Sequence, residues 1–499
     1  MSLIKKNIIA NYLGNAWVSI IGFIFLPLYL FFLGAEAYGL VGFYLVLAGT
    51  VILFDLGIGA TTTREFARLS ENEHASESML DIYRSLEVVV WGVSASISLI
   101  VIIFSSAITL HWLNADSLDV DIATIAVKLM GVSLFFQIPL TFYNAALIGL
   151  QRQEKLNIFN AVFATLKWVG GAILLWQISS RVDVFFGWQV FVIILNIFTI
   201  HRYFSGVFKI ESRGRFRWGS IKSVWGYSIR VGGINILSII IMQSDKIIVS
   251  LLLPLKQFAY YSLSWVIVGF LARLIGPVYN AFFPKFIQIS DSNNNYELFK
   301  IYHLSCQLVS LAIIPASLML AFFSFELIEL WVKNSEIASD VRWVVALLAV
   351  GTMFNGLMNI PYGLQLASGL TNLAFIINVF AVIFTVPAVY FLTSNYGLIG
   401  AASVWLMLNV GYVIFVPFFM HRVILNDGVS KRKWYMHTVF APLITTLIVY
   451  SIALNFVPML PGFLGFIILF IIGSVGFIAS ACVMPDVFSV IKRKFYYFK

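Results

Sequence analysis

Residues 8–59 read IIANYLGNAWVSIIGFIFLPLYLFFLGAEAYGLVGFYLVLAGTVILFDLGIG. The stretch holds two apolar runs, 8–33 and 37–59, and its only charged residues are Glu36 and Asp55. About 20 consecutive apolar residues in a helix cross the hydrocarbon core of a bilayer. Each run reaches that length, and a short Gly-containing segment separates them. The stretch therefore predicts two transmembrane helices joined by a tight turn.

The rest of the chain repeats this pattern. Of its 499 residues 60% are hydrophobic, 16% are aromatic and only 11% are charged, and the mean hydropathy is +0.93. Soluble domains carry about 25% charged residues, so this chain cannot cover a water-exposed surface. It is predicted to be an all-α integral membrane protein of about fourteen transmembrane helices. The further ranges are 85–110, 122–147, 158–178, 183–203, 224–252, 258–281, 300–323, 341–365, 372–393, 398–420, 438–457 and 463–484.

The chain shows weak internal similarity at an offset of 215–220 residues. Asn15 recurs as Asn235, and Asn144 recurs as Asn359. Six helices separate each pair, so the two copies enter the membrane from the same side. Parallel repeats are a common plan of transporters, although chance matches between apolar segments would look similar. The predicted organisation is an N-terminal lobe (1–203), a basic cytoplasmic linker (204–223), a C-terminal lobe (224–420) and two appended helices with a basic tail (421–499), with the two six-helix lobes around a central cavity.

The positive charge gathers on one side of the predicted helices. Of the 32 Lys and Arg residues, 23 fall in the termini and in the loops on the same side as the termini. Cytoplasmic loops of membrane proteins are enriched in Lys and Arg, so both termini are expected in the cytoplasm. The net charge of +9 is therefore a topology signal, and no nucleic-acid partner is expected.

The sequence lacks common catalytic and nucleotide-binding motifs of soluble enzymes. There is no Gly-x4-Gly-Lys phosphate loop and no His-Glu-x-x-His pattern. The two cysteines, Cys306 and Cys482, both lie in apolar segments. No loop is long enough to form a folded extramembrane domain. The chain is expected not to be an enzyme, and no catalytic residues, cofactor or metal site are predicted.

Charged residues within the apolar ranges are the first candidates for function. A charge near the bilayer centre costs about 2.5–3.5 kcal/mol on insertion scales, so it usually has a partner or faces water. The basic candidates, which would line a cationic cavity for an anionic cargo, are Arg230, Arg273, Lys167 and Lys128. The acidic candidates for ion coupling are Asp245 and Asp55. Lysines near helix ends can instead extend to the interface, and Asp245 could form a static ion pair with its neighbour Lys246.

Polar residues at helical spacing form a second group of candidates. They follow one face of the first, fourth, seventh and tenth helices, which correspond in pairs under the repeat. Such stripes can line an aqueous path, and they can also hold helices together through hydrogen bonds. The predicted cavity residues are Asn15, Gln137, Asn144, Asn235, Asn355 and Asn359.

Short motifs give the chain a family resemblance. They are the run Leu33-Gly34-Ala35-Glu36-Ala37-Tyr38-Gly39, the run Phe54-Asp55-Leu56-Gly57-Ile58-Gly59, the run Gly149-Leu150-Gln151-Arg152-Gln153-Glu154-Lys155-Leu156-Asn157, the run Asp245-Lys246-Ile247-Ile248 and the run Tyr396-Gly397-Leu398-Ile399-Gly400. With these motifs the chain resembles the polysaccharide-exporter (Wzx-like) branch of the multidrug/oligosaccharidyl-lipid/polysaccharide (MOP) exporter superfamily. Asp245-Lys246 departs from the Asp-Arg of many members.

The resemblance implies a flippase of the bacterial inner membrane. Its cargo would be an undecaprenyl-pyrophosphate-linked oligosaccharide, an O-antigen or related repeat unit, moved from the cytoplasmic to the periplasmic leaflet by alternating access. Because the sequence has no nucleotide site, directional movement is expected to draw on an ion gradient or on consumption of the cargo outside. Expected partners are this cargo, membrane lipids, and the polymerase and chain-length machinery of the same pathway. The alternatives are a cation-coupled multidrug exporter of the same superfamily and a membrane-embedded glycan polymerase or ligase.

Overall fold

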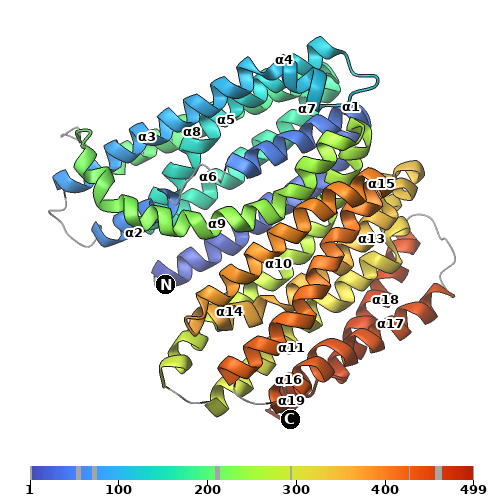
Figure 1. Cartoon of the computed structure of the whole chain (residues 1–499). Coiled ribbons are helices and arrows are strands. Elements are labelled where there is room, and N and C mark those ends of the chain that lie inside the picture. Colours follow the sequence, from blue (N-terminus) through green and yellow to red (C-terminus); the bar gives the residue numbers. More distant parts are fainter. Residues whose placement is uncertain are drawn as a thin grey trace. The chain divides into compact units, whose positions relative to one another are not determined.

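The structure is a computed structural model that describes residues 3–51, 58–69, 76–207, 214–292, 295–425, 428–455 and 463–497. These residues are helical almost throughout (Figure 1). Eleven of their helical segments are long and apolar enough to cross a membrane. The prediction of an all-α, multi-pass membrane protein is therefore confirmed.

Two of the eleven segments each contain two helices. Helix α1 (Leu3–Val51) changes direction at Gly34, where φ is 78° and ψ is 165°. Helix α15 (Thr371–Met420) does the same at Gly397, with φ 58° and ψ −138°. Because glycine lacks a Cβ, it adopts positive φ at little steric cost. With these two breaks and helix α9 (Trp218–Leu252), the described helices correspond to the fourteen predicted ranges.

The described chain divides into two compact units, Met1–Ala259 and Tyr260–Lys499. In the first unit α5 is central, with α3 and α8 beside it and α2 against it, while α1 packs on α6 (Figure 1). Helix α9 contacts α1, α2 and α3, so its contacts lie in the first unit. The lobe boundaries at 203 and 224 stay a prediction. The first unit further contains α2 (Ile58–Leu69), α3 (Ser76–Ile103), α4 (Ser105–Ala107), η2 (Ile108–Trp112), α5 (Val120–Gly149), α6 (Gln153–Thr165), η3 (Leu166–Gly170), α7 (Gly171–Gln177) and α8 (Val182–Val207).

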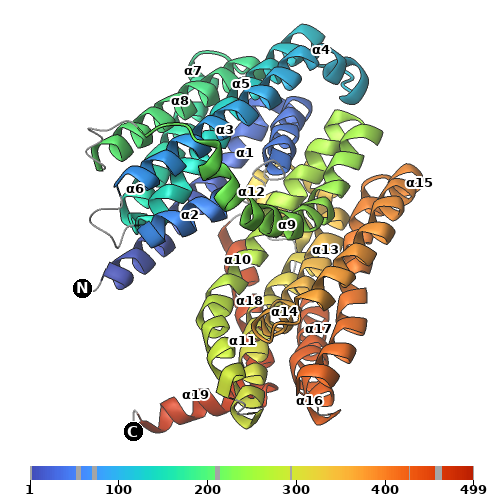
Figure 2. The same ribbon diagram turned by 60° about the vertical axis from the view of Figure 1, so that its left-hand side comes forward.

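In the second unit α13 lies between α11 and α15, and the pair α17 and α18 packs against α11 (Figure 2). Tyr302 and His421 share a hydrogen bond of 3.0 Å in its buried interior. The remaining helices are α10 (Leu255–Ser292), which begins in the first unit, α11 (Asn295–Phe322), α12 (Ser324–Val332), α13 (Ser335–Leu357), α14 (Asn359–Ala367), η4 (His421–Leu425), α16 (Gly428–Lys433), η5 (Trp434–Phe440), α17 (Ala441–Leu454), α18 (Phe463–Cys482) and α19 (Pro485–Tyr497).

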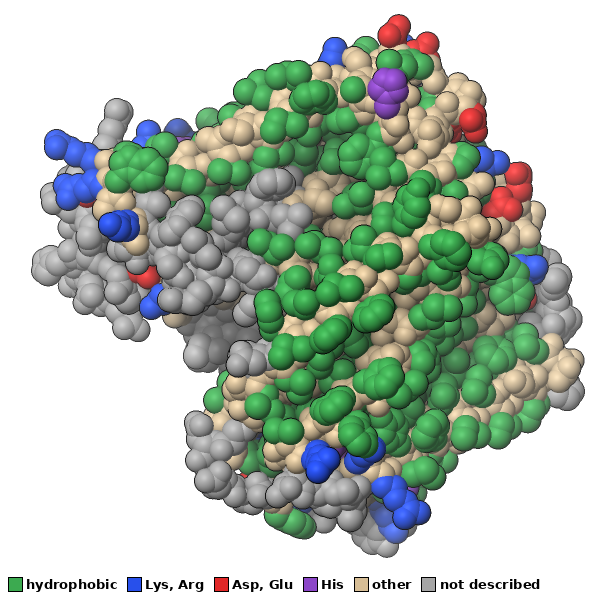
Figure 3. All heavy atoms as spheres, in the orientation of Figure 1, with side chains coloured by type: hydrophobic (Ala, Val, Ile, Leu, Met, Phe, Trp, Pro, Cys, Tyr) green, Lys and Arg blue, Asp and Glu red, His purple; other side chains and the backbone are tan. Residues whose placement is uncertain are grey.

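Large apolar side chains cover the outer helix faces. Phe31 is 79% exposed, and Phe384 and Phe470 are 70% and 68% exposed. Figure 3 shows hydrophobic side chains along the helices, with charged groups at helix ends. Contiguous apolar surfaces of this extent are rare on soluble monomers. They are the expected boundary with lipid chains.

Candidate functional site

A polar pocket lies inside the first unit, and we call it the Lys167 pocket. Its volume is about 100 Å³. Five elements supply its wall: α1, α5, α6, η3 and α8. Its polar lining residues are Tyr44, Ser133, Gln137, Asn160, Lys167, Gln189 and Asn196, and its apolar ones are Leu140, Phe163, Ala164, Val192 and Ile193.

Lys167 enters this pocket from a stretch of π-helix, η3. A π-helix widens the helical turn, and the N–H of Gly171, directly after η3, donates to the carbonyls of Lys167 and Trp168. Here Tyr29 donates its hydroxyl to the carbonyls of Lys167 and Trp168, both at 2.9 Å, and Trp188 donates its indole N–H to the carbonyl of Leu166 at 3.1 Å. The surrounding aromatic side chains therefore stabilise the irregular turn that presents Lys167.

The polar groups of the Lys167 pocket have unused bonding capacity. The Lys167 ammonium lies 6.0 Å from the centre of the Tyr44 ring, and no described carboxylate forms an ion pair with it. Gln189 is 4% exposed, and both of its amide atoms lack a partner among the described residues; the same holds for Oδ1 of Asn196, which is 8% exposed. Buried polar atoms are nearly always hydrogen-bonded. The pocket is therefore prepared for a polar ligand or for water.

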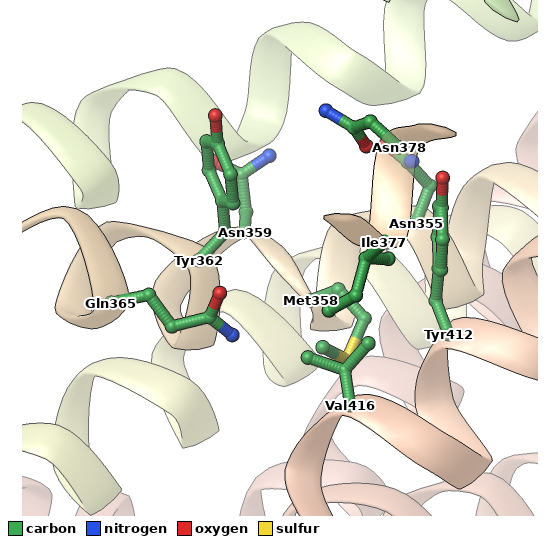
Figure 4. Close-up of a pocket in the computed structure, with 9 residues that line it drawn as sticks. All are labelled: Asn355, Met358, Asn359, Tyr362, Gln365, Ile377, Asn378, Tyr412 and Val416. Carbon is green, nitrogen blue, oxygen red and sulfur yellow. The ribbon is translucent and has the colours of Figure 1, made fainter. Parts of the chain in front are cut away.

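A second pocket lies inside the second unit, and we call it the Asn359 pocket. Its volume is about 150 Å³. It is lined by Asn355, Met358, Asn359, Tyr362, Gln365, Ile377, Asn378, Tyr412 and Val416 (Figure 4). It forms where α13 ends at Leu357 and the short helix α14 begins at Asn359. Pro361 lacks an N–H and so leaves the carbonyl four residues earlier without a helical partner, which favours a break at this position.

Three of the predicted cavity residues line one of the two pockets. Gln137 lines the Lys167 pocket, and Asn144, seven residues further along α5, has a buried Oδ1 without a partner among the described residues. Asn355 and Asn359 both line the Asn359 pocket. Asn355 also donates to Oδ1 of Asn409 at 2.8 Å, so it serves helix packing as well.

Other predicted residues lie elsewhere. Asn15 on α1 and Lys128 on α5 have exposed side chains and line neither pocket. Arg273 on α10 is exposed, with its guanidinium carbon 4.7 Å from the centre of the Phe270 ring. Asp245 on α9 is 6% exposed, and one of its carboxylate oxygens lies 3.4 Å from Nζ of Lys246.

Three predictions lie outside the described residues. They concern Asp55 and the side chains of Arg230 and Asn235. Their roles stay predictions.

The sequence reading missed several lining residues. Gln189 and Asn196 are seven residues apart on α8, and Asn160 and Lys167 have the same separation along α6 and η3. Two helical turns place such residues on one face, so the periodicity test that selected Gln137 would also have found them. Only the packing of α5, α6 and α8 shows that these faces meet.

Comparisons with known proteins agree on a family and a fold. A model of the polysaccharide biosynthesis protein family matches residues 4–290, more than half of the chain. A putative O-antigen transporter of Shigella flexneri is 24% identical over 405 residues, which are 81% of this chain and 94% of that protein.

Solved structures share the fold at low sequence identity. The lipid II flippase MurJ in an inward closed conformation superposes with a TM-score of 0.75 at 14% identity, covering 97% of this chain and 99% of its own. An inward-facing multidrug resistance transporter of the MATE family, MOP superfamily, gives a TM-score of 0.68 at 13% identity, covering 83% and 95%. These likenesses show the fold. The chain belongs to the polysaccharide biosynthesis protein family and shares the helical fold of these two solved structures.

Proposed function

We propose that this protein is a flippase for a lipid-linked oligosaccharide of a bacterial surface polysaccharide. It would move an undecaprenyl-pyrophosphate-linked repeat unit, as for O-antigen, from the cytoplasmic to the periplasmic leaflet of the inner membrane. The family to which the chain belongs and the name of its Shigella flexneri relative support a polysaccharide cargo. The polymerase and chain-length machinery that use the flipped product are natural partners.

The observation that carries the proposal is the unpaired lysine of the Lys167 pocket. A lysine among membrane-spanning helices is costly, so it is retained where it meets an anion or a water-filled path. Lys167 has no ion-pair partner among the described carboxylates, and neutral amide groups surround it. A pyrophosphate offers negative oxygens to the ammonium, and sugar hydroxyls can donate to and accept from amides.

The same observation separates the proposal from a multidrug exporter with cationic cargo. A lysine repels a cation, and burying two like charges together costs free energy. The MATE-like fold alone does not decide this, because one fold can carry different functions. The charge of the Lys167 pocket favours an anionic cargo.

A transport assay in proteoliposomes tests the proposal. Undecaprenyl pyrophosphate bearing one fluorescently labelled N-acetylhexosamine is incorporated, and its appearance in the outer leaflet is followed by chemical quenching. We expect wild type to accelerate this movement and Lys167→Ala to slow it about 10–100-fold, because a hydrogen bond to a charged group contributes roughly 1.5–3 kcal/mol.

The matched control is Lys155→Ala. Lys155 is an exposed lysine on α6, twelve positions before Lys167 and outside the pocket, and its replacement should leave the rate unchanged. If wild type does not move this lipid but does export a cationic dye, the flippase proposal is wrong and the multidrug exporter replaces it.

A further inference from the structure

We propose that the Asn359 pocket is a binding site for one uncharged sugar ring of the cargo. The inference rests on the proposed function and extends it, since it assigns a second site, inside the second unit, and a class of sugar. The cavity of about 150 Å³ is smaller than the roughly 300–1,000 Å³ of drug-sized pockets. It therefore admits a single ring rather than a whole oligosaccharide.

Hydrogen-bonding groups of the pocket are available to a ligand. Gln365 is 1% exposed and its Nε2 has no partner among the described residues. The side chains of Asn359, Asn378, Tyr362 and Tyr412 likewise make no hydrogen bond to described residues. In Figure 4 the amides of Asn359 and Asn378 point into the same space from α14 and α15. Amides and phenols both donate and accept, which matches the paired character of sugar hydroxyls.

The remaining wall suits the apolar face of a sugar ring. Met358, Ile377 and Val416 gather in the lower part of Figure 4, on the side opposite the hydroxyl of Tyr412. A pyranose has C–H bonds on one face and hydroxyls around its edge. An apolar patch combined with a few convergent polar groups is the usual composition of a small-molecule site.

The residues that line the Asn359 pocket determine whether a neutral or a charged sugar can bind there. None of the nine lining residues is Asp, Glu, Lys, Arg or His. A buried carboxylate without a cation loses its hydration uncompensated, so an acidic sugar should be excluded. This pocket thus differs from the Lys167 pocket, where a lysine is present.

The test measures binding of two lipids to the full-length protein in nanodiscs. One probe is undecaprenyl pyrophosphate without sugar, and the other carries N-acetylglucosamine. We expect Asn359→Leu and Asn378→Leu each to weaken binding of the sugar-bearing lipid about tenfold, as expected for loss of one or two hydrogen bonds, and to leave binding of the bare lipid unchanged. A third probe that carries glucuronic acid should bind wild type more weakly than the N-acetylglucosamine lipid.

Asn395→Leu is the matched control. Asn395 also lies on α15 but is exposed, outside the pocket, and donates only to the carbonyl of Phe391 in its own helix, at 2.7 Å. It should bind all three lipids as wild type does. If wild type binds bare and N-acetylglucosamine-bearing lipid equally, or if Asn359→Leu and Asn378→Leu weaken both, the sugar site is refuted while the flippase proposal stands. If wild type binds neither lipid, the flippase proposal itself fails, and this inference falls with it.

Discussion

Charged residues within the helices differ in how many hydrogen-bond and ion-pair partners they have among the described residues. Glu87, 3% exposed on α3, accepts hydrogen bonds from Tyr83 at 3.0 Å and Tyr143 at 2.6 Å and pairs with Arg84 at 2.5 Å. Such a saturated carboxylate fixes α3 to α5. Lys167 lacks a comparable set of partners. Because of this contrast we assign a structural role to Glu87 and a cargo-binding role to Lys167.

Asp245 is the residue at which we expect ion coupling. It is 6% exposed, and one of its carboxylate oxygens lies 3.4 Å from Nζ of Lys246. We expect Asp245→Asn to bind cargo normally but to lose the acceleration of transport by an imposed proton or sodium gradient, because an amide cannot exchange a proton or hold a cation electrostatically. The measurement is the proteoliposome rate with and without the gradient.

Asp183→Asn serves as the comparison for this experiment. It removes an ion-paired carboxylate at the start of α8 and should keep the gradient response. An equal response of wild type and Asp245→Asn would make Asp245 a static ion-pair member.

At the scale of elements, two glycines decide where the long helices turn. Gly34 and Gly397 have φ values of 78° and 58°, and both lie in motifs that carry the family resemblance. A Cβ at Gly34 would meet nothing within 4 Å. Steric crowding therefore cannot explain the glycine there, and the backbone conformation alone does.

This gives a stability prediction with an internal control. Gly34→Ala should lower the free energy of unfolding by about 1–3 kcal/mol, the cost of a side chain in a sparsely allowed backbone region. Gly92→Ala, in the regular part of α3 and also without a neighbour within 4 Å, should raise it by about 0.5–1 kcal/mol. Denaturant titration in detergent measures both. A Gly34→Ala variant as stable as wild type would show that the turn does not need positive φ.

At the scale of the whole molecule, charge determines orientation. Because 23 of 32 basic residues fall on the side of the termini, we expect both termini and the loop 204–223 in the cytoplasm. Reporter fusions after Lys222 and after Lys256 should report opposite compartments, since most of α9, from residue 223 to Leu252, lies between them. The same compartment for both fusions would contradict the fourteen-helix topology.

The sequence by itself determined that the chain is a helical membrane protein, roughly where each helix lies, and the family it resembles. Bilayer thickness is the reason: it imposes an apolar length on every span, and that length can be read without knowing any neighbour. The two turns at Gly34 and Gly397 likewise depend on the local sequence, because glycine adopts positive φ without help from distant parts of the chain.

Only the tertiary structure decided which polar residues share a site. Gln137, Asn160, Lys167 and Gln189 come from α5, α6, η3 and α8 and meet in one pocket, while Lys128 and Asn15, chosen by the same sequence criteria, are exposed. The rotation of each helix about its axis depends on side-chain packing against helices far away in the sequence. The hydropathy pattern of one helix does not contain that information. The sequence could therefore suggest candidate residues but could not show which of them share a pocket.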